Sequence, residues 1–167
     1  MKVAIFDLGS NTTKLLIAEV VDRGRPQVVA EESRPCRLTT GGGKKFSFSE
    51  ESIDRLLAVL TELMKIARDH EVERMKAVAT EAFRKSENSQ ELIALAQASL
   101  GLPISVLTGL EEAGAIAAGL LSDPSIERFD DFLALDLGGG SMEVIAVKER
   151  EVTSVESLPL GAAVVSN

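Results

Sequence analysis

The chain has 167 residues, is 45% hydrophobic and carries a formal net charge of -8. That length and apolar content are enough for a buried core, whereas the negative average field disfavours nucleic acid as a partner. Cys36 is the only cysteine, which excludes an internal disulfide, and no apolar run is long enough to cross a membrane. We therefore expect a cytoplasmic protein with no membrane partner.

Strand and helix patterns alternate along the first part of the chain. Ser49 is a plausible N-cap for a helix in which apolar residues recur at three- and four-residue spacing as far as Ala67. Two further helices are predicted over residues 89–100 and 109–121. The predicted strands cover residues 2–8, 12–21, 27–33, 75–79 and 104–107. Three strands followed by helix, strand, helix, strand and helix indicate an α/β fold.

An internal repeat relates the beginning of the chain to its last third. Residues 4–9 match residues 133–138 without a gap, at the offset of 129 residues that separates Asp7 from Asp136. The same frame aligns residues 15–18 with residues 144–147. A shared Asp-Leu-Gly turn followed by a second strand makes a chance match improbable.

The repeat predicts two related lobes, residues 1–128 and 129–167. In the second lobe, strands are predicted over residues 132–136, 141–148 and 151–157, with no helix after them. Strands of this kind need helices to cover their faces. We therefore expect the second lobe to be incomplete here, and to be completed by the rest of that lobe or by a second copy in a homodimer.

The residues after each repeated aspartate favour phosphate binding. Glycine lets the backbone approach an anion closely, and successive N–H groups can form a concave anion site. The turns at residues 9–11 and 138–141 are both built of small residues. Asp7 and Asp136 would repel phosphate directly, so they are better suited to hold a divalent cation or to orient a water molecule.

The repeated hairpins resemble those of the actin-like, ribonuclease-H-like phosphotransferase superfamily. Within it, the chain resembles the exopolyphosphatase and guanosine pentaphosphate phosphohydrolase family, because five segments match that family's motifs in order. These segments are Phe6-Asp7-Leu8-Gly9-Ser10-Asn11-Thr12, Ala77-Val78-Ala79-Thr80-Glu81-Ala82-Phe83-Arg84, Thr108-Gly109-Leu110-Glu111-Glu112-Ala113, Asp136-Leu137-Gly138-Gly139-Gly140-Ser141-Met142-Glu143 and Leu158-Pro159-Leu160-Gly161-Ala162. The resemblance implies a ribonuclease-H-like lobe with a mixed sheet and flanking helices, plus the first strands of a similar lobe.

The resemblance also implies the site. It gives Glu111 the role of general base, with Asp136 and Glu143 as further catalytic carboxylates linked to Mg²⁺ and to the attacking water. Mg²⁺ would be held by Asp7, Asp136 and Glu143. The implied phosphate-binding residues are Gly9, Ser10, Asn11, Lys14, Arg84, Gly138, Gly139, Gly140 and Ser141. The implied substrate is inorganic polyphosphate or guanosine pentaphosphate.

Several of these residues also have a purely structural interpretation. Carboxylates in the first turn of a helix are favoured by the helix dipole, which would by itself explain Glu111. His70 lies near a helix end and Cys36 is expected to be structural, so neither is given a catalytic role. Residues 41–45 lack the four-residue spacing between glycines of a nucleotide P-loop and the Ser or Thr that follows its lysine. They are therefore not interpreted as a P-loop.

Three departures from the family pattern concern substrate preference. Lys14 stands where arginine is more common, Gly114 follows the Glu-Glu-Ala segment where arginine is common, and residues 37–39 lack the usual following glycine. Two other functions stay open. One is a kinase or ATPase of the same superfamily, and the other is a non-catalytic phosphate-binding module that self-associates. Whether the chain hydrolyses phosphate on its own is also left open.

Overall fold

The computed structural model describes residues 1–21, 25–38 and 46–162, which include neither the glycine-rich stretch at residues 41–45 nor Thr39. The chain divides into two compact units, Met1–Val106 and Leu107–Asn167. This division falls before the helix at residues 109–122, whereas the predicted lobe boundary follows residue 128. The difference arises because that helix packs against strands of the second unit.

The first unit is built on a five-stranded mixed sheet with the order β3-β2-β1-β4-β5. Its strands are β1 (Lys2–Leu8), β2 (Thr12–Glu19), β3 (Gln27–Pro35), β4 (Arg74–Ala79) and β5 (Ile104–Val106). The first three form an antiparallel meander, and β4 and β5 continue the sheet parallel to β1. All five predicted strands are therefore present.

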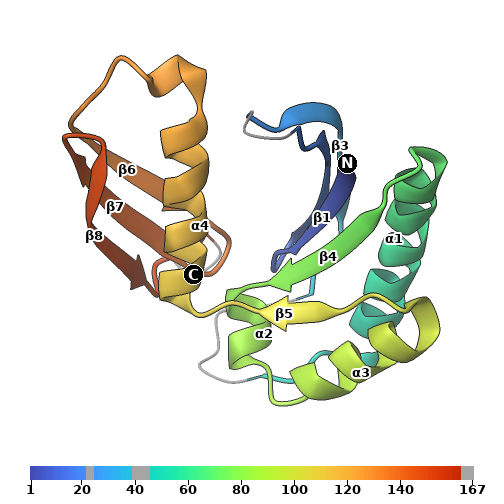
Figure 1. Ribbon diagram of the computed structural model, residues 1–167. Coiled ribbons are helices and arrows are strands. Elements are labelled where there is room, and N and C mark those ends of the chain that lie inside the picture. The colour runs from blue at the N-terminus through green and yellow to red at the C-terminus, as the bar shows by residue number, and fades with distance from the viewer. Residues whose placement is uncertain (22–24, 39–45, 163–167) are drawn as a thin grey trace. The chain divides into compact units, whose positions relative to one another are not determined.

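Helix α1 (Glu50–Asp69) lies along the first sheet (Figure 1) and supplies much of its core. It begins as predicted, with the Ser49 hydroxyl accepting from the Ser52 N–H at 3.2 Å. Its leucines pack with Ala4, Phe6 and Leu8 of β1 in one buried cluster. Burial of each such leucine contributes roughly 1.5–3 kcal/mol.

Two shorter helices are also described in the first unit. Helix α3 (Ser89–Leu100) ends at Gly101, whose φ of 67° is the left-handed conformation that glycine adopts without strain. Helix α2 (Glu81–Lys85) was not predicted, because five residues directly after a strand show no helical periodicity.

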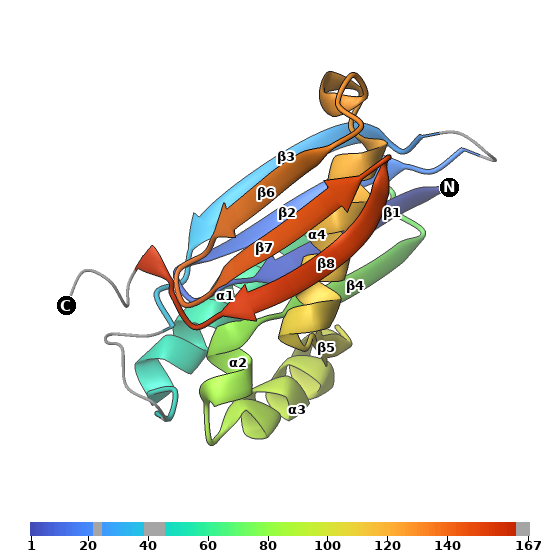
Figure 2. The same cartoon turned by 90° about the vertical axis from the view of Figure 1, so that its left-hand side faces the viewer.

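The second unit is a three-stranded antiparallel sheet, β6-β7-β8, with helix α4 (Gly109–Ser122) on one face. Figure 2 shows α4 running behind the three strands. The strands are β6 (Phe132–Leu137), β7 (Met142–Lys148) and β8 (Glu151–Leu158), and a short 3-10 turn, η1 (Pro124–Ile126), follows α4. Ala113 and Ala117 of α4 pack on Ile145 and Val147 of β7. No described helix is both long and apolar enough to span a membrane.

The other face of this sheet carries exposed leucines. Leu133, Leu135 and Leu137 are 64%, 61% and 59% exposed. The repeat aligns them with Ala4, Phe6 and Leu8, which are fully buried under α1 in the first unit. The equivalent apolar strand face is therefore covered by a helix in the first unit and exposed in the second.

The two hairpins, β1-β2 and β6-β7, share their register. Asp7 pairs with Lys14 across β1 and β2, and Asp136 pairs with Glu143 across β6 and β7, again at an offset of 129 residues. A β-bulge interrupts the next strand pair at Ile17/Ala18 in the first unit and at the equivalent Ala146/Val147 in the second. The structure therefore confirms the repeat and shows that it extends to the third strand.

Candidate functional site

The turn between β1 and β2 is held tightly by the backbone. The Gly9 N–H donates to the Thr12 carbonyl at 3.1 Å, and a Cβ at Gly9 would lie only 2.9 Å from that oxygen. The carbonyls of Ser10 and Asn11 accept from N–H groups of residues 36–38 at 2.7–3.0 Å. These hydrogen bonds tie the turn to the segment that follows β3.

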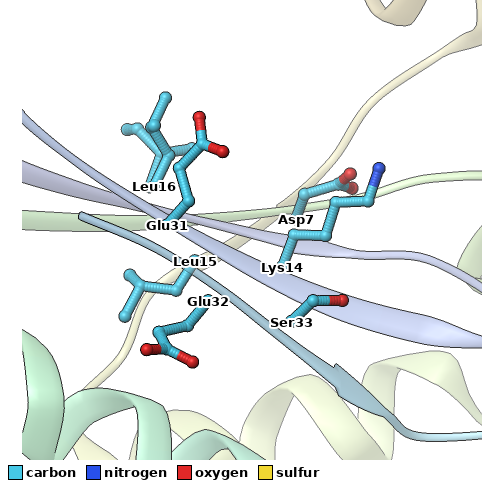
Figure 3. Close-up of a pocket in the computed structure, with 8 residues that line it drawn as sticks. Asp7, Lys14, Leu15, Leu16, Glu31, Glu32 and Ser33 are labelled. Carbon is cyan, nitrogen blue, oxygen red and sulfur yellow. The ribbon is translucent and has the colours of Figure 1, made fainter. Parts of the chain in front are cut away.

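A row of polar side chains lies beside this turn. Asp7 pairs with Lys14, which in turn pairs with Ser33 of β3. The side chains of Asp7 and Lys14 extend to the same side of the sheet (Figure 3). Directly opposed residues share one face of an antiparallel sheet and lie within reach of one another. The row therefore combines a carboxylate, an ammonium group and a hydroxyl.

The row borders an open pocket of about 640 Å³. Ile5, Leu16 and Glu31 line it in the next row of the same face, while Leu15 and Glu32 project to the other side (Figure 3). One end of the pocket can bind a charged group, and the rest offers mainly apolar surface.

Arg84 lies at the same edge of the first sheet as the Gly9–Asn11 turn. Its helix, α2, begins directly after β4, and β4 is parallel to β1 with Ala79 paired to Leu8. The carboxyl ends of the two strands therefore meet at one edge. The first unit thus groups the predicted residues Asp7, Gly9, Ser10, Asn11, Lys14 and Arg84 at this edge.

The second unit repeats the turn. The Gly138 N–H donates to the Ser141 carbonyl at 2.9 Å, and the Ala162 N–H donates to the Gly138 carbonyl at 2.9 Å. Gly161 packs directly on the turn, because a Cβ there would lie 2.3 Å from the backbone of Gly139 and Gly140. Ser141 is buried at the end of the turn.

Asp136, Glu143 and Ser157 form the row that corresponds to Asp7, Lys14 and Ser33. Glu143 is only 1% exposed, whereas Asp136 is exposed. The Ser157 hydroxyl donates to Oε1 of Glu143 at 2.8 Å. A buried carboxylate is costly unless it is hydrogen-bonded, and Ser157 supplies such a bond.

Glu111 caps helix α4. Its Oε2 accepts from the Thr108 N–H at 2.8 Å and from the Thr108 hydroxyl at 2.9 Å, and the Thr108 Oγ1 accepts from the Glu111 N–H at 3.2 Å. This reciprocal pair is a capping box. The structural role considered for Glu111 is therefore present. It does not conflict with a role as base, because an ionised carboxylate has several lone pairs.

The carboxylates of the second unit are of the kind that Mg²⁺ prefers. No group of three or more His, Cys, Asp or Glu side chains suited to a metal occurs within residues 1–21, 25–38 and 46–162. Protein sites for Mg²⁺ often supply only one or two carboxylates, and water and substrate phosphates complete the shell. Asp136 and Glu143 provide such a pair, and Asp7 provides a single carboxylate in the first unit.

Two residues of these rows were not predicted as site residues: Ser33 and Ser157. The strands themselves were predicted, but a two-residue turn at Glu149 and Arg150 followed by regular pairing would place Glu156 opposite Glu143. The bulge at Ala146/Val147 moves Ser157 into that place instead. No pattern in the sequence indicates the bulge.

Comparisons with known sequences and solved structures identify related proteins. Residues 16–167 match the model of the Ppx/GppA phosphatase family. The chain is 29% identical to "Exopolyphosphatase 1" of Mycobacterium tuberculosis, covering 97% of this chain and 47% of that protein. Among solved structures, an exopolyphosphatase from Cytophaga hutchinsonii is 31% identical with a TM-score of 0.87, covering 96% of this chain and 51% of that one. The Aquifex aeolicus PPX-GPPA enzyme is 34% identical with a TM-score of 0.81, covering 96% and 53%.

These matches confirm the predicted actin-like fold. The chain spans about half the length of the curated relatives it matches.

Proposed function

Because this chain belongs to the Ppx/GppA phosphatase family, we propose that the protein it forms removes the terminal phosphate from inorganic polyphosphate, in the cytoplasm. The reaction is hydrolysis of a phosphoanhydride. Water attacks the terminal phosphorus, the bond from that phosphorus to the bridging oxygen breaks, and phosphate leaves the shortened chain.

The observation that carries this proposal is the pair of equivalent hairpins. Both have a glycine turn closed by the same backbone hydrogen bond, from Gly9 to Thr12 and from Gly138 to Ser141. Each places an aspartate two residues before the first glycine of the turn. Tight turns of small residues bring backbone N–H groups close to phosphate oxygens, and each unit supplies one such turn.

The side chains divide the chemical work. Lys14 and Arg84 supply positive charge for the phosphoryl oxygens, where charge is concentrated during phosphoryl transfer. Glu111 takes the proton from the attacking water. Asp136 and Glu143 would hold Mg²⁺, which when bound neutralises charge on the phosphate groups.

Guanosine pentaphosphate is the second candidate substrate, and the pocket beside Lys14 favours it. Ile5 and Leu16 give the pocket apolar surface, and Glu31 adds a carboxylate. A further stretch of polyphosphate would be repelled by that carboxylate, whereas an uncharged nucleoside would not. A carboxylate also accepts hydrogen bonds well from N–H groups.

The test measures phosphate release from polyphosphate and from guanosine pentaphosphate, with Mg²⁺, by this chain and by Asp136→Asn. We expect release by the chain and a loss of at least 100-fold in the variant, the usual size of one electrostatic contribution. Glu151→Gln removes one exposed charge from β8 and serves as the control. Equal release by the chain and by Asp136→Asn would refute the proposed role of the second hairpin.

Self-association without turnover is a second candidate function, favoured by the exposed leucines of β6. An apolar face of this kind marks an interaction surface. In the first unit the equivalent residues are covered by α1. For the isolated chain we infer that the face is covered by a second copy, since each copy offers the same row of leucines.

Sedimentation velocity over a range of concentrations tests this association. We expect the chain to form dimers and Leu135→Ser to stay monomeric. Leu95→Ser, which changes a 47% exposed leucine on α3, is the matched control and should associate as the unmodified chain does. A monomeric chain that releases phosphate would contradict the binding-module alternative.

A further inference from the structure

Glu143 has an unusual environment for a glutamate. It lies on the face of β7 that α4 covers, in line with Ile145 and Val147, and is 1% exposed. A long side chain at the end of an apolar row has several rotamers of similar energy unless a polar partner selects one. The partner that selects the rotamer therefore decides where the carboxylate points.

Ser157 is that partner. The bulge in β7-β8 makes Ser157 the residue directly opposite Glu143, and its hydroxyl donates to Oε1 at 2.8 Å. A hydrogen bond to an ionised acceptor is among the stronger ones in proteins. It occupies one carboxylate oxygen and leaves the lone pairs of the other for a cation or water.

Gly109 holds Ser157 from the other side. It is the first residue of α4, and a Cβ there would lie 2.6 Å from the Ser157 Cβ and 2.7 Å from its Oγ. Real Cβ atoms do not approach that closely, so only glycine allows α4 to begin against this hydroxyl. The serine side chain is thus confined between the start of α4 and Glu143.

We propose that Ser157 and Gly109 are positioning residues that orient the Glu143 carboxylate for its role at the site. This inference rests on the proposed function, in which Glu143 contributes to a magnesium site with Asp136. Partners that orient a metal ligand typically change metal affinity about 10- to 100-fold when they are removed. Neither residue touches substrate in this scheme, since both act through Glu143.

The test measures cation binding directly, together with phosphate release, on the full chain. Mn²⁺ replaces Mg²⁺ as a paramagnetic probe, and its binding is followed by the relaxation of backbone amides at residues 136–143. We expect Ser157→Ala to weaken Mn²⁺ binding about 10-fold and to raise the Mg²⁺ concentration for half-maximal phosphate release by a similar factor. The KM for polyphosphate at saturating Mg²⁺ should stay unchanged.

Gly109→Ala tests the same arrangement from α4 and should weaken Mn²⁺ binding in the same direction. Each variant has a control in its own element. Ser154→Ala removes another hydroxyl from β8, and Gly114→Ala adds a methyl group to α4 where nothing lies within 4 Å. Both controls should bind Mn²⁺ as the unmodified chain does. Circular dichroism establishes that every variant is folded under the assay conditions.

A double-mutant cycle separates positioning from a general loss of structure. In a Glu143→Gln background, Ser157→Ala should cause no further loss of Mn²⁺ binding, because the carboxylate it orients is gone. Additive losses would overturn the inference. The inference would also be overturned if Ser157→Ala bound Mn²⁺ as tightly as the unmodified chain. The proposed function would stand in that case. If the unmodified chain neither binds Mn²⁺ nor releases phosphate, the proposed function fails and the inference fails with it.

Discussion

Glu143 occupies in the second unit the position that Lys14 occupies in the first. Each is the direct cross-strand partner of the repeated aspartate, Asp136 or Asp7. The repeat therefore preserves the backbone and reverses the charge at one position. By its charge, a lysine beside the first turn suits an anion such as phosphate, and a glutamate beside the second suits a cation.

Replacement of Lys14 should weaken phosphate binding without affecting stability. Lys14→Met removes a charged donor whose hydrogen bond to phosphate is worth about 1.5–3 kcal/mol, so we expect affinity for tripolyphosphate to fall at least about 10-fold. The side chain is exposed, so the free energy of unfolding should change by less than about 0.5 kcal/mol. Isothermal titration calorimetry measures the affinity.

The control for Lys14 is Lys65→Met. Lys65 is 78% exposed and pairs with Asp69 on α1. Lys65→Met changes the net charge by the same amount as Lys14→Met. If both variants lost affinity equally, the effect would come from the overall charge and not from Lys14.

Replacement of Glu111 by glutamine should separate capping from catalysis. Glutamine can keep both parts of the capping box with Thr108, so we expect the stability to urea to change little. A neutral amide cannot accept the proton from water, and phosphate release should fall about 100- to 10,000-fold.

Thr108→Ala provides the opposite case for helix α4. It removes the cap, which costs about 0.5–2 kcal/mol of stability, and leaves the Glu111 carboxylate in place. Urea unfolding and phosphate release are measured on both variants. We expect Glu111→Gln to lose phosphate release more than stability, and Thr108→Ala to lose stability more than phosphate release. A Glu111→Gln variant with full activity would show that Glu111 is only a cap.

Substitution of Gly161 should disturb the second turn. A Cβ at this position would overlap the backbone of Gly139 and Gly140 at 2.3 Å, and overpacking of this kind typically costs about 1–3 kcal/mol. We expect Gly161→Ala to lower the midpoint of thermal unfolding. Gly119→Ala, in α4 with nothing within 4 Å, should instead leave it unchanged or raise it. An unchanged midpoint in Gly161→Ala would show that residues 158–162 do not support the turn.

Cys36 should react slowly with thiol reagents in the folded protein. The thiol is fully buried, and this desolvation raises its pKa above the ordinary value of 9.0. The thiolate is the reactive form, so modification at neutral pH should accelerate many-fold when urea unfolds the chain. Rapid modification without urea would contradict the buried position.

The same shift predicts a pH dependence of stability. A thiol with a raised pKa holds its proton more tightly in the folded state than in the unfolded state. Its contribution to the free energy of unfolding is therefore fully present below pH 9.0. The free energy of unfolding should then fall as the pH rises from 9.0 through the raised pKa. In Cys36→Ala this part of the pH dependence should disappear.

Local sequence patterns predicted the strands, the three longer helices and the two aspartate turns, because these depend on periodicity, capping and glycine. The repeat was also visible from the Asp-Leu-Gly match. Helix α2 was missed since five residues are too few to show a period, and the unit boundary differed because α4 packs on a sheet that follows it in the chain.

The side chains that complete the two rows could be identified from the folded structure alone. Ser33 and Ser157 reach Lys14 and Glu143 through equivalent bulges, and a bulge shifts the pairing by one residue without leaving a mark in the sequence pattern. The close approach of Gly109 to Ser157 likewise depends on how α4 packs across the sheet. Contacts between distant segments are set by packing, and local sequence patterns do not encode them.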